Sequence, residues 1–118
     1  MKENMIKDKS FAFAVRIVRL YKYLQDNKNE YVLSKQMLRS GTSIGAMVRE
    51  AEHAETKNDF IHKIAIAQKE ANETIYWLEL LKETEYLTIA QFESIHENAI
   101  EVIKLLTSIS KTAKTINH

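Results

Sequence analysis

Two Glu-x-x-His motifs are the clearest candidates for chemistry in this chain of 118 residues: Glu50 with His53, and Glu93 with His96. Di-iron proteins of the ferritin type bind their metals through two such motifs and single glutamates from two further helices. In this chain the motifs fall near opposite ends of two predicted helices that run in the same direction, and residues 10–25 contain no glutamate. We therefore read both motifs as solvated helix faces and expect no metal and no cofactor.

Other reactive side chains are few. His62, two residues after Phe60, lies off the apolar seam of its predicted helix and is expected to hydrogen bond to a neighbouring helix or subunit. The chain has two glycines and no cysteine, which excludes a glycine-rich phosphate loop, a thiolate zinc site and a cysteine nucleophile. The sequence predicts no catalytic residues, no enzymatic activity and no small-molecule substrate.

The elements that must position these residues are helices. Proline is absent, and apolar residues recur in alternating steps of three and four, the spacing of long helices packed nearly parallel or antiparallel. We predict four helices over about residues 10–25, 30–54, 57–83 and 89–111, after a loose polar lead. Their short connections favour an all-α, antiparallel up-down-up-down four-helix bundle in a single domain, residues 1–118.

Capping residues mark where the predicted helices begin. Asn29 is expected to be the N-cap of the second helix. Thr56 with Asp59, and Thr88 with Gln91, have the spacing of capping boxes that open the third and fourth helices. Because a cap satisfies N–H groups that the first turn leaves unpaired, these residues set the predicted boundaries.

The only two glycines, Gly41 and Gly45, lie four residues apart inside the second predicted helix. Each costs about 1 kcal/mol relative to alanine in a helix interior. A spacing of four places both on one face, where the missing side chains allow another backbone to approach. We expect close helix packing at this face.

Apolar residues cover more of two helices than a single bundle needs. Over residues 10–25 they span roughly half of the helix at about 100° per residue, and Ile66 and Trp77 lie away from the seam that runs from Phe60 to Leu81. A helix that is apolar beyond one stripe usually has more than one packing partner. We therefore predict a homo-oligomer with Ile66 and Trp77 in its interface.

The net charge of +1 argues against avid binding of nucleic acid over the whole surface. Basic residues are nevertheless concentrated on the first two helices, where the candidates for contact with nucleic acid or another anion are Arg16, Arg19, Lys22, Lys35, Arg39 and Arg49. If a ring of copies brings these side chains together, they would bind phosphate without reading bases. The alternative is that Arg16 and Arg39 pair with glutamates of adjacent helices or subunits, and we expect a structural ion pair involving Arg39 or Glu50.

Location follows from what the sequence lacks. No signal peptide is evident, and the longest apolar runs, such as residues 11–15, are too short to span a bilayer. The absence of cysteine gives no sign of a disulfide-stabilised, secreted scaffold. We predict a cytoplasmic protein with no membrane partner.

The segment from Leu38 to Leu81 resembles the signature region of a family of small bacterial four-helix bundles, the 23S rRNA intervening-sequence proteins. The family pattern has an Arg-Ser/Ala pair before Thr-Ser-Ile, an alanine-rich turn with an acidic residue, then Phe-Ile-His and a glutamate-rich apolar stretch. The matching residues here are Arg39-Ser40, Thr42-Ser43-Ile44, Glu50, Phe60-Ile61-His62 and Glu70 to Leu81. The resemblance extends over nearly the whole chain.

This resemblance implies a left-handed up-down-up-down bundle whose relatives assemble as ring-like homopentamers. A related branch comprises accessory proteins of diversity-generating retroelements, which partner a reverse transcriptase and bind nucleic acid. The leading hypothesis is thus a non-enzymatic oligomeric protein that acts as an interaction or accessory protein. The alternatives are a nucleic-acid-binding accessory factor for RNA or DNA and, from a third class, a metal-dependent enzyme.

Overall fold

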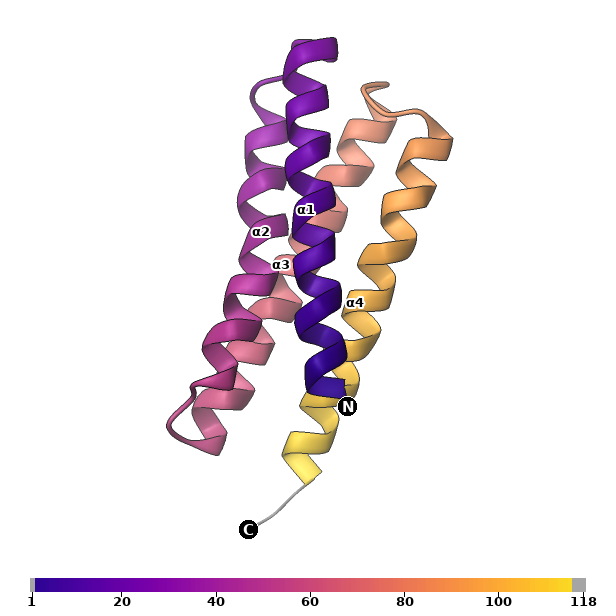
Figure 1. The fold of residues 1–118 in the computed structure, drawn as a ribbon. Coiled ribbons are helices and arrows are strands. Elements are labelled where there is room, and N and C mark those ends of the chain that lie inside the picture. Colours follow the sequence, from indigo (N-terminus) through magenta and orange to yellow (C-terminus); the bar gives the residue numbers. More distant parts are fainter. Residues whose placement is uncertain (1, 116–118) are drawn as a thin grey trace.

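Four long helices make up the structure of this chain, a computed structural model that describes residues 2–115. They are α1 (Lys2–Lys28), α2 (Leu33–Glu52), α3 (Lys57–Glu83) and α4 (Ile89–Thr115). Consecutive helices run in opposite directions and form an elongated rod of 51 × 21 × 19 Å (Figure 1). The predicted all-α, up-down-up-down four-helix bundle is confirmed.

The helices are arranged in a ring in which each one contacts its two neighbours in sequence, and α4 closes the ring against α1. Between helices on the diagonal, α1 with α3 and α2 with α4, no Cα atoms come within 8 Å of each other, and only their side chains share the core. The core lies along the axis and is filled mainly by aliphatic side chains, because apolar positions spaced three and four apart face inward on each helix. Its fully buried members include Phe13, Ile17, Leu24, Met37, Ile44, Ile64, Leu78, Leu81 and Leu106.

The first helix is longer than predicted, because the expected loose lead before Ser10 is helical from Lys2 onward. Ile6 is only 2% exposed and belongs to the core. The amino group of Lys2 also reaches across to α4, where it donates a hydrogen bond to Ser108 at 2.6 Å. The polar residues of this lead thus flank a core position, and their contacts with α4 extend the helix by two turns.

The turn between α1 and α2 differs from the prediction. Asn29 is not an N-cap, since it adopts a left-handed conformation with φ of 53° after the end of α1. The side chain that serves the first turn of α2 is Glu30, whose carboxylate accepts hydrogen bonds from the backbone N–H groups of Val32, Leu33 and Ser34. Helix α2 consequently begins at Leu33 and ends at Glu52, inside the predicted range of 30–54.

The predicted cap residues are in place at the starts of α3 and α4, and the one at α4 is a complete capping box. The Thr56 side chain accepts a hydrogen bond from the Asp59 N–H at 3.0 Å. Thr88 and Gln91 form the reciprocal pair, in which each backbone N–H donates to the other side chain, at 2.9 and 3.1 Å. These caps fix the starts of α3 and α4 at the predicted residues 57 and 89, whereas α4 continues to Thr115, four residues past the predicted end.

The end of α3 is closed by a Schellman motif. The N–H of Tyr86 donates to the Leu81 carbonyl and the N–H of Glu85 to the Lys82 carbonyl, the paired bonds that define this motif. Glu85 occupies the left-handed position with φ of 67°, where a side chain is strained and glycine is preferred.

Replacing this residue by glycine is expected to stabilise the protein. Glu85 is exposed and its side chain forms no ion pair within residues 2–115. Glu85→Gly should therefore raise the free energy of unfolding by about 0.5–1 kcal/mol through relief of the left-handed strain. Urea denaturation at fixed protein concentration measures the change, and Glu79→Gly, at an exposed position inside α3, is the control that should destabilise. A loss of stability in Glu85→Gly would contradict this reading of the motif.

The glycine pair lies where α2 packs on α1. A Cβ built on Gly41 would approach Cγ1 and Cγ2 of the buried Ile17 to 2.8 and 2.9 Å. A Cβ built on Gly45 would lie 3.5 Å from the carbonyl oxygen of Ser10, an ordinary contact. At Gly41 the missing side chain makes room for a neighbouring side chain, and at Gly45 it lets the α1 backbone approach.

Candidate interaction surfaces

A polar cluster links α2 to α3 near the middle of the bundle. The Arg39 guanidinium forms an ion pair with Glu73 and lies 3.6 Å from the carboxylate of Glu70. The indole N–H of Trp77 donates to the same Glu73 carboxylate at 3.0 Å. The Trp77 and Arg39 hydrogen bonds lower the pKa of Glu73 against its partial burial, so it stays ionised. Of the two interpretations of Arg39, pairing with glutamates of the adjacent helix is the one observed.

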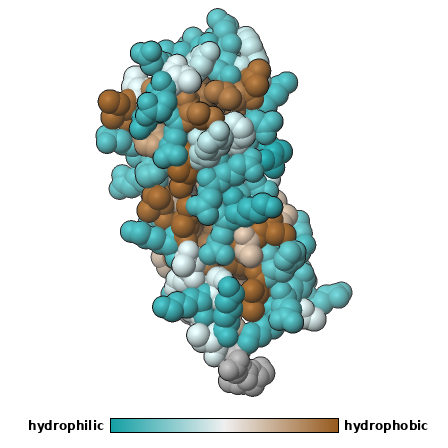
Figure 2. All heavy atoms as spheres, turned by 180° about the vertical axis from the view of Figure 1, so that it is seen from behind, coloured by the Kyte–Doolittle hydropathy of each residue, from teal (hydrophilic) through white to brown (hydrophobic). Residues whose placement is uncertain are grey.

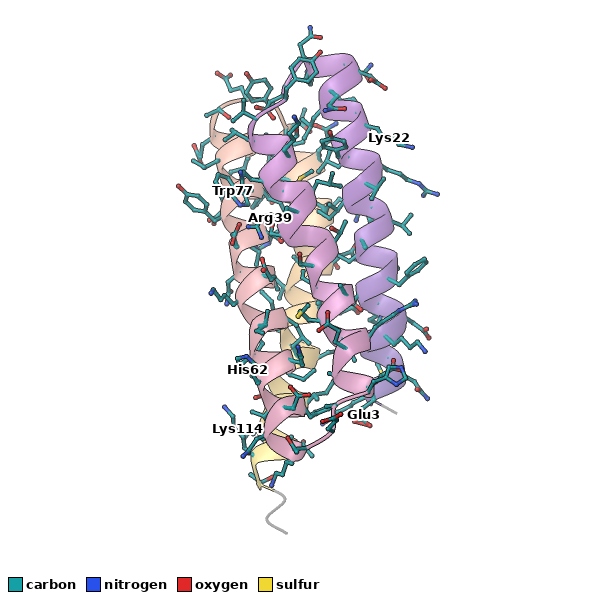
Figure 3. All side chains as sticks on the ribbon, turned by 90° about the vertical axis from the view of Figure 1, so that its left-hand side faces the viewer. Glu3, Lys22, Arg39, His62, Trp77 and Lys114 are labelled. Atoms are coloured by element: carbon teal, nitrogen blue, oxygen red, sulfur yellow. The ribbon has the colours of Figure 1, made fainter. Side chains whose placement is uncertain are left out.

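Beside this cluster, the outer surface of α3 carries a group of partly exposed apolar side chains, which we call the α3 patch. It consists of Ile66, Tyr76, Trp77 and Leu80. Tyr76 is 53% exposed and packs edge-on against Trp77, with ring centroids 5.0 Å apart. Ile66, Trp77 and Leu80 are half-buried, and Figure 3 shows Trp77 on the outside of the bundle close to Arg39.

A second set of contacts holds α1 against α4. Lys2 donates to Ser108, Lys9 forms an ion pair with Glu101 at 3.1 Å, and Arg16 donates to the carbonyl and hydroxyl oxygens of Ser94. Arg16 also hydrogen bonds to Asn98. The three cations are spaced seven residues apart, and so are their partners on α4. We call this set the α1–α4 latch.

The latch changes the interpretation of Arg16. Its guanidinium donates hydrogen bonds to the uncharged groups of Ser94 and Asn98. Pairing with a glutamate of an adjacent helix of the same chain is therefore wrong, and Arg16 does not form one exposed strip with Arg19 and Lys22. Sequence reasoning missed this role. The heptad spacing of Lys2, Lys9 and Arg16 was the available signal, and it needed the start of α1 to be placed correctly.

The remaining basic candidates lie on exposed positions of α1 and α2. Arg19, Lys22, Lys35 and Arg49 are all exposed, and Figure 3 shows Lys22 extending away from the bundle. Arg49 lies over the ring of Phe11 at 5.5 Å. No aspartate or glutamate occurs in residues 9–25 or 33–49, so this side of the bundle is locally basic.

The two Glu-x-x-His motifs lie on α2 and α4, which are diagonal helices with no Cα atoms within 8 Å of each other. Glu50 is bound to Lys63 at 2.9 Å, an ion pair that raises the pKa of Lys63. His96 stacks on Phe92 with ring centroids 4.9 Å apart. Within residues 2–115 no three histidine or carboxylate side chains gather as metal ligands would.

His62 is exposed on the outer side of α3 (Figure 3). The expected hydrogen bond to a neighbouring helix is not formed among the described residues, because the side chain lies away from α2 and α4. Within the same part of the chain, no helix is long and apolar enough to cross a membrane.

Fold and surface together define a four-helix bundle whose outer face combines aromatic side chains with ion pairs. The chain belongs to the family of 23S rRNA-intervening sequence proteins, because the sequence model of that family matches residues 2–108. It is also similar to a crystal structure of a protein of unknown function from the S23 ribosomal protein family of Bacteroides thetaiotaomicron. The two chains share 62% identity with a TM-score of 0.93, over 94% of this chain and 99% of the other. Among curated proteins, none matches.

Proposed function

We propose that this protein is a non-enzymatic bundle that assembles with copies of itself and acts as an interaction or accessory protein, with a homopentamer as the favoured assembly and the cytoplasm as its location. The observation that carries the proposal is the α3 patch. Two aromatic rings and two aliphatic side chains lie outside the core on one helix, and their burial against a second copy would be favourable.

Other apolar side chains reach the surface as well. Phe11, Val32 and Ile89 are 57%, 71% and 68% exposed. Figure 2 shows apolar side chains in a broken strip along the face turned away from α1. Scattered apolar residues are normal on protein surfaces, but an aromatic pair beside ion-paired Arg39 and Glu73 has the composition of an interface, in which Tyr, Trp and Arg are enriched.

A charge placed in the α3 patch should weaken the assembly. Tyr76→Glu would place a carboxylate beside Trp77 and near Glu73, so each contact between copies would bury an unpaired charge. We expect the dissociation constant of the oligomer to rise by about a hundredfold, measured by light scattering over a dilution series. Thr112→Glu, at an exposed position of α4, is the matched control and should assemble as the parent does. An unchanged assembly in Tyr76→Glu would remove the α3 patch from the interface.

A nucleic-acid-binding accessory factor, acting on RNA or DNA together with a reverse transcriptase, is the second candidate. The supporting observation is the exposed Arg19, Lys22, Lys35 and Arg49 on two helices whose central parts lack carboxylates. Oligomer symmetry would multiply this modest charge.

Gel-shift titrations over a salt series test this candidate. Binding carried by phosphate contacts should be strongest at about 50 mM salt and weaken by tenfold or more towards about 200 mM. Lys22→Glu with Lys35→Glu should weaken binding further, and Lys104→Glu with Lys111→Glu, on α4, is the control with the same change in net charge. No shift at the lowest salt would eliminate the candidate.

A further inference from the structure

The seam between α1 and α4 is closed along one half of the rod and open along the other. The α1–α4 latch lies between Lys2 and Arg16 on α1. Beyond Arg16 the two helices diverge towards the α3–α4 turn, which is visible in Figure 1 as the separation of the upper ends of α1 and α4. Two hollows follow one another along this open half.

The first hollow, of about 310 Å³, is lined by Arg16, Arg19, Leu20, Tyr23, Gln91 and Ile95. The second, of about 550 Å³, lies at the end of the rod, where the end of α3 and the α3–α4 turn face Lys28 of α1. Its lining residues include Lys28, Lys82, Tyr86, Leu87 and Ile89. On α1 the hollows extend from Arg16 to Lys28, which is about 18 Å at 1.5 Å per residue. That length accommodates about three turns of a helix laid along the seam, at about 5.4 Å per turn.

The chemistry of the lining is apolar at the floor and basic at the rim. Leu20 and Tyr23 are partly buried and pack against the core, to which Ile95 belongs with 2% exposure. Ile89 at the far end is 68% exposed. Arg19 and Lys28 are exposed on the rim, and neither lies within 4.0 Å of a carboxylate among residues 2–115. Of the lining carboxylates, Glu83 lies 3.6 Å from Lys82 and Glu85 is exposed at the end of the rod.

We propose that the open half of the α1–α4 seam binds one amphipathic helix of a partner protein, with its aliphatic face on Leu20, Tyr23 and Ile89 and its acidic flank towards Arg19 and Lys28. An apolar floor between two helices is the usual receptor for such a helix. The basic rim selects acidic partners by charge complementarity. The inference rests on the proposed role as an interaction protein and assigns the surface that the partner uses.

A displayed peptide library tests the proposal without knowledge of the natural partner. Its members are helices of about 15 residues with a fixed aliphatic stripe and flanking positions drawn from Asp, Glu, Lys and Arg. Selection on the full chain should enrich Asp and Glu at the flanks. The double variant Arg19→Glu with Lys28→Glu should weaken binding of a selected acidic peptide by about tenfold or more, and Lys104→Glu with Lys111→Glu should change it by less than about twofold.

Because the chain has no cysteine, Lys22→Cys, at an exposed position of α1 outside the proposed contacts, allows the bound peptide to be located by cross-linking. Three results would each overturn the proposal. They are that no peptide is enriched, that basic flanks are enriched as much as acidic ones, or that the Arg19→Glu, Lys28→Glu variant binds the selected peptide as the parent does. If that variant instead loses self-assembly, the seam is an interface between copies. If it loses only RNA binding, the seam belongs to nucleic acid. Failure of the wild-type chain to self-assemble would count against the proposed oligomer and leave the seam proposal standing.

Discussion

Gly41→Ala is expected to lower the free energy of unfolding by about 1–2 kcal/mol, whereas Gly45→Ala, one turn away, raises it by about 0.5 kcal/mol. Both substitutions gain helix propensity, by up to about 1 kcal/mol. They differ in what the new methyl group meets. At Gly41 it would come within 3 Å of both Cγ atoms of Ile17, a side chain that is fully buried and branched at Cβ.

Ile17 has no easy way to make room, because rotation about χ1 exchanges one Cγ for the other. Overpacking of this kind costs about 1–3 kcal/mol and outweighs the gain in propensity. At Gly45 the nearest atom is the Ser10 carbonyl oxygen at 3.5 Å, which a methyl group tolerates. Urea denaturation of both variants at one protein concentration gives the comparison. If Gly41→Ala and Gly45→Ala both stabilised the protein, α1 and α2 would have to pack less tightly at Gly41 than the contacts with Ile17 indicate.

Glu30→Ala should cost about 2 kcal/mol, because it removes the acceptor for three backbone N–H groups at the start of α2. Those groups lie 2.7–3.2 Å from the carboxylate oxygens. Glu30 is only 6% exposed, so water cannot readily replace the lost acceptor. Capping contributes about 0.5–2 kcal/mol at ordinary helix starts, and the charge near the positive end of the α2 dipole adds to it.

Because the Glu30 carboxylate titrates, we expect the free energy of unfolding to depend on pH. Burial opposes its ionisation, but the N–H groups of Ser34, Leu33 and Val32 outweigh this and lower the pKa of Glu30. The contribution of Glu30 is therefore fully present above the ordinary glutamate pKa of about 4.3, and it is lost as pH falls through the lower pKa of the folded state.

Unfolding measured from pH 7 down to about pH 3 tests this assignment. The parent protein should lose more stability over this range than Glu30→Gln, which keeps an oxygen acceptor and does not titrate. Glu97→Gln, at an exposed position of α4, is the control and should follow the parent. Equal pH profiles for the parent and Glu30→Gln would contradict the role of Glu30.

Sequence periodicity was sufficient for the four helices and for the caps at Thr56 and Thr88, because both depend on local spacing. It failed at the start of α1 and at the start of α2. The polar residues after Met1 were predicted to lie outside the helix. Their partners Ser108 and Glu101 are on a helix about one hundred residues away, so local periodicity gives no sign of these contacts. Glu30 was missed as a cap because Val32, immediately before α2, has a helical conformation, so the usual extended N-cap pattern does not apply.

The surface was harder to predict than the fold. The pairing of Arg39 follows from opposite charges on neighbouring helices, and both Arg39 and Glu50 form ion pairs as expected. The partners of Arg16 are uncharged, so only the register between α1 and α4 identifies them. The hollows along the α1–α4 seam depend on how two helices diverge, which no local pattern encodes.

The central claim is that copies of the chain cover the apolar side chains which a single bundle leaves exposed. Sedimentation velocity of the wild-type protein, from about 1 to about 100 μM, tests it most directly. We predict one oligomeric species, a pentamer by preference, that persists through the micromolar range. A single species with the mass of one chain at every concentration would contradict the claim.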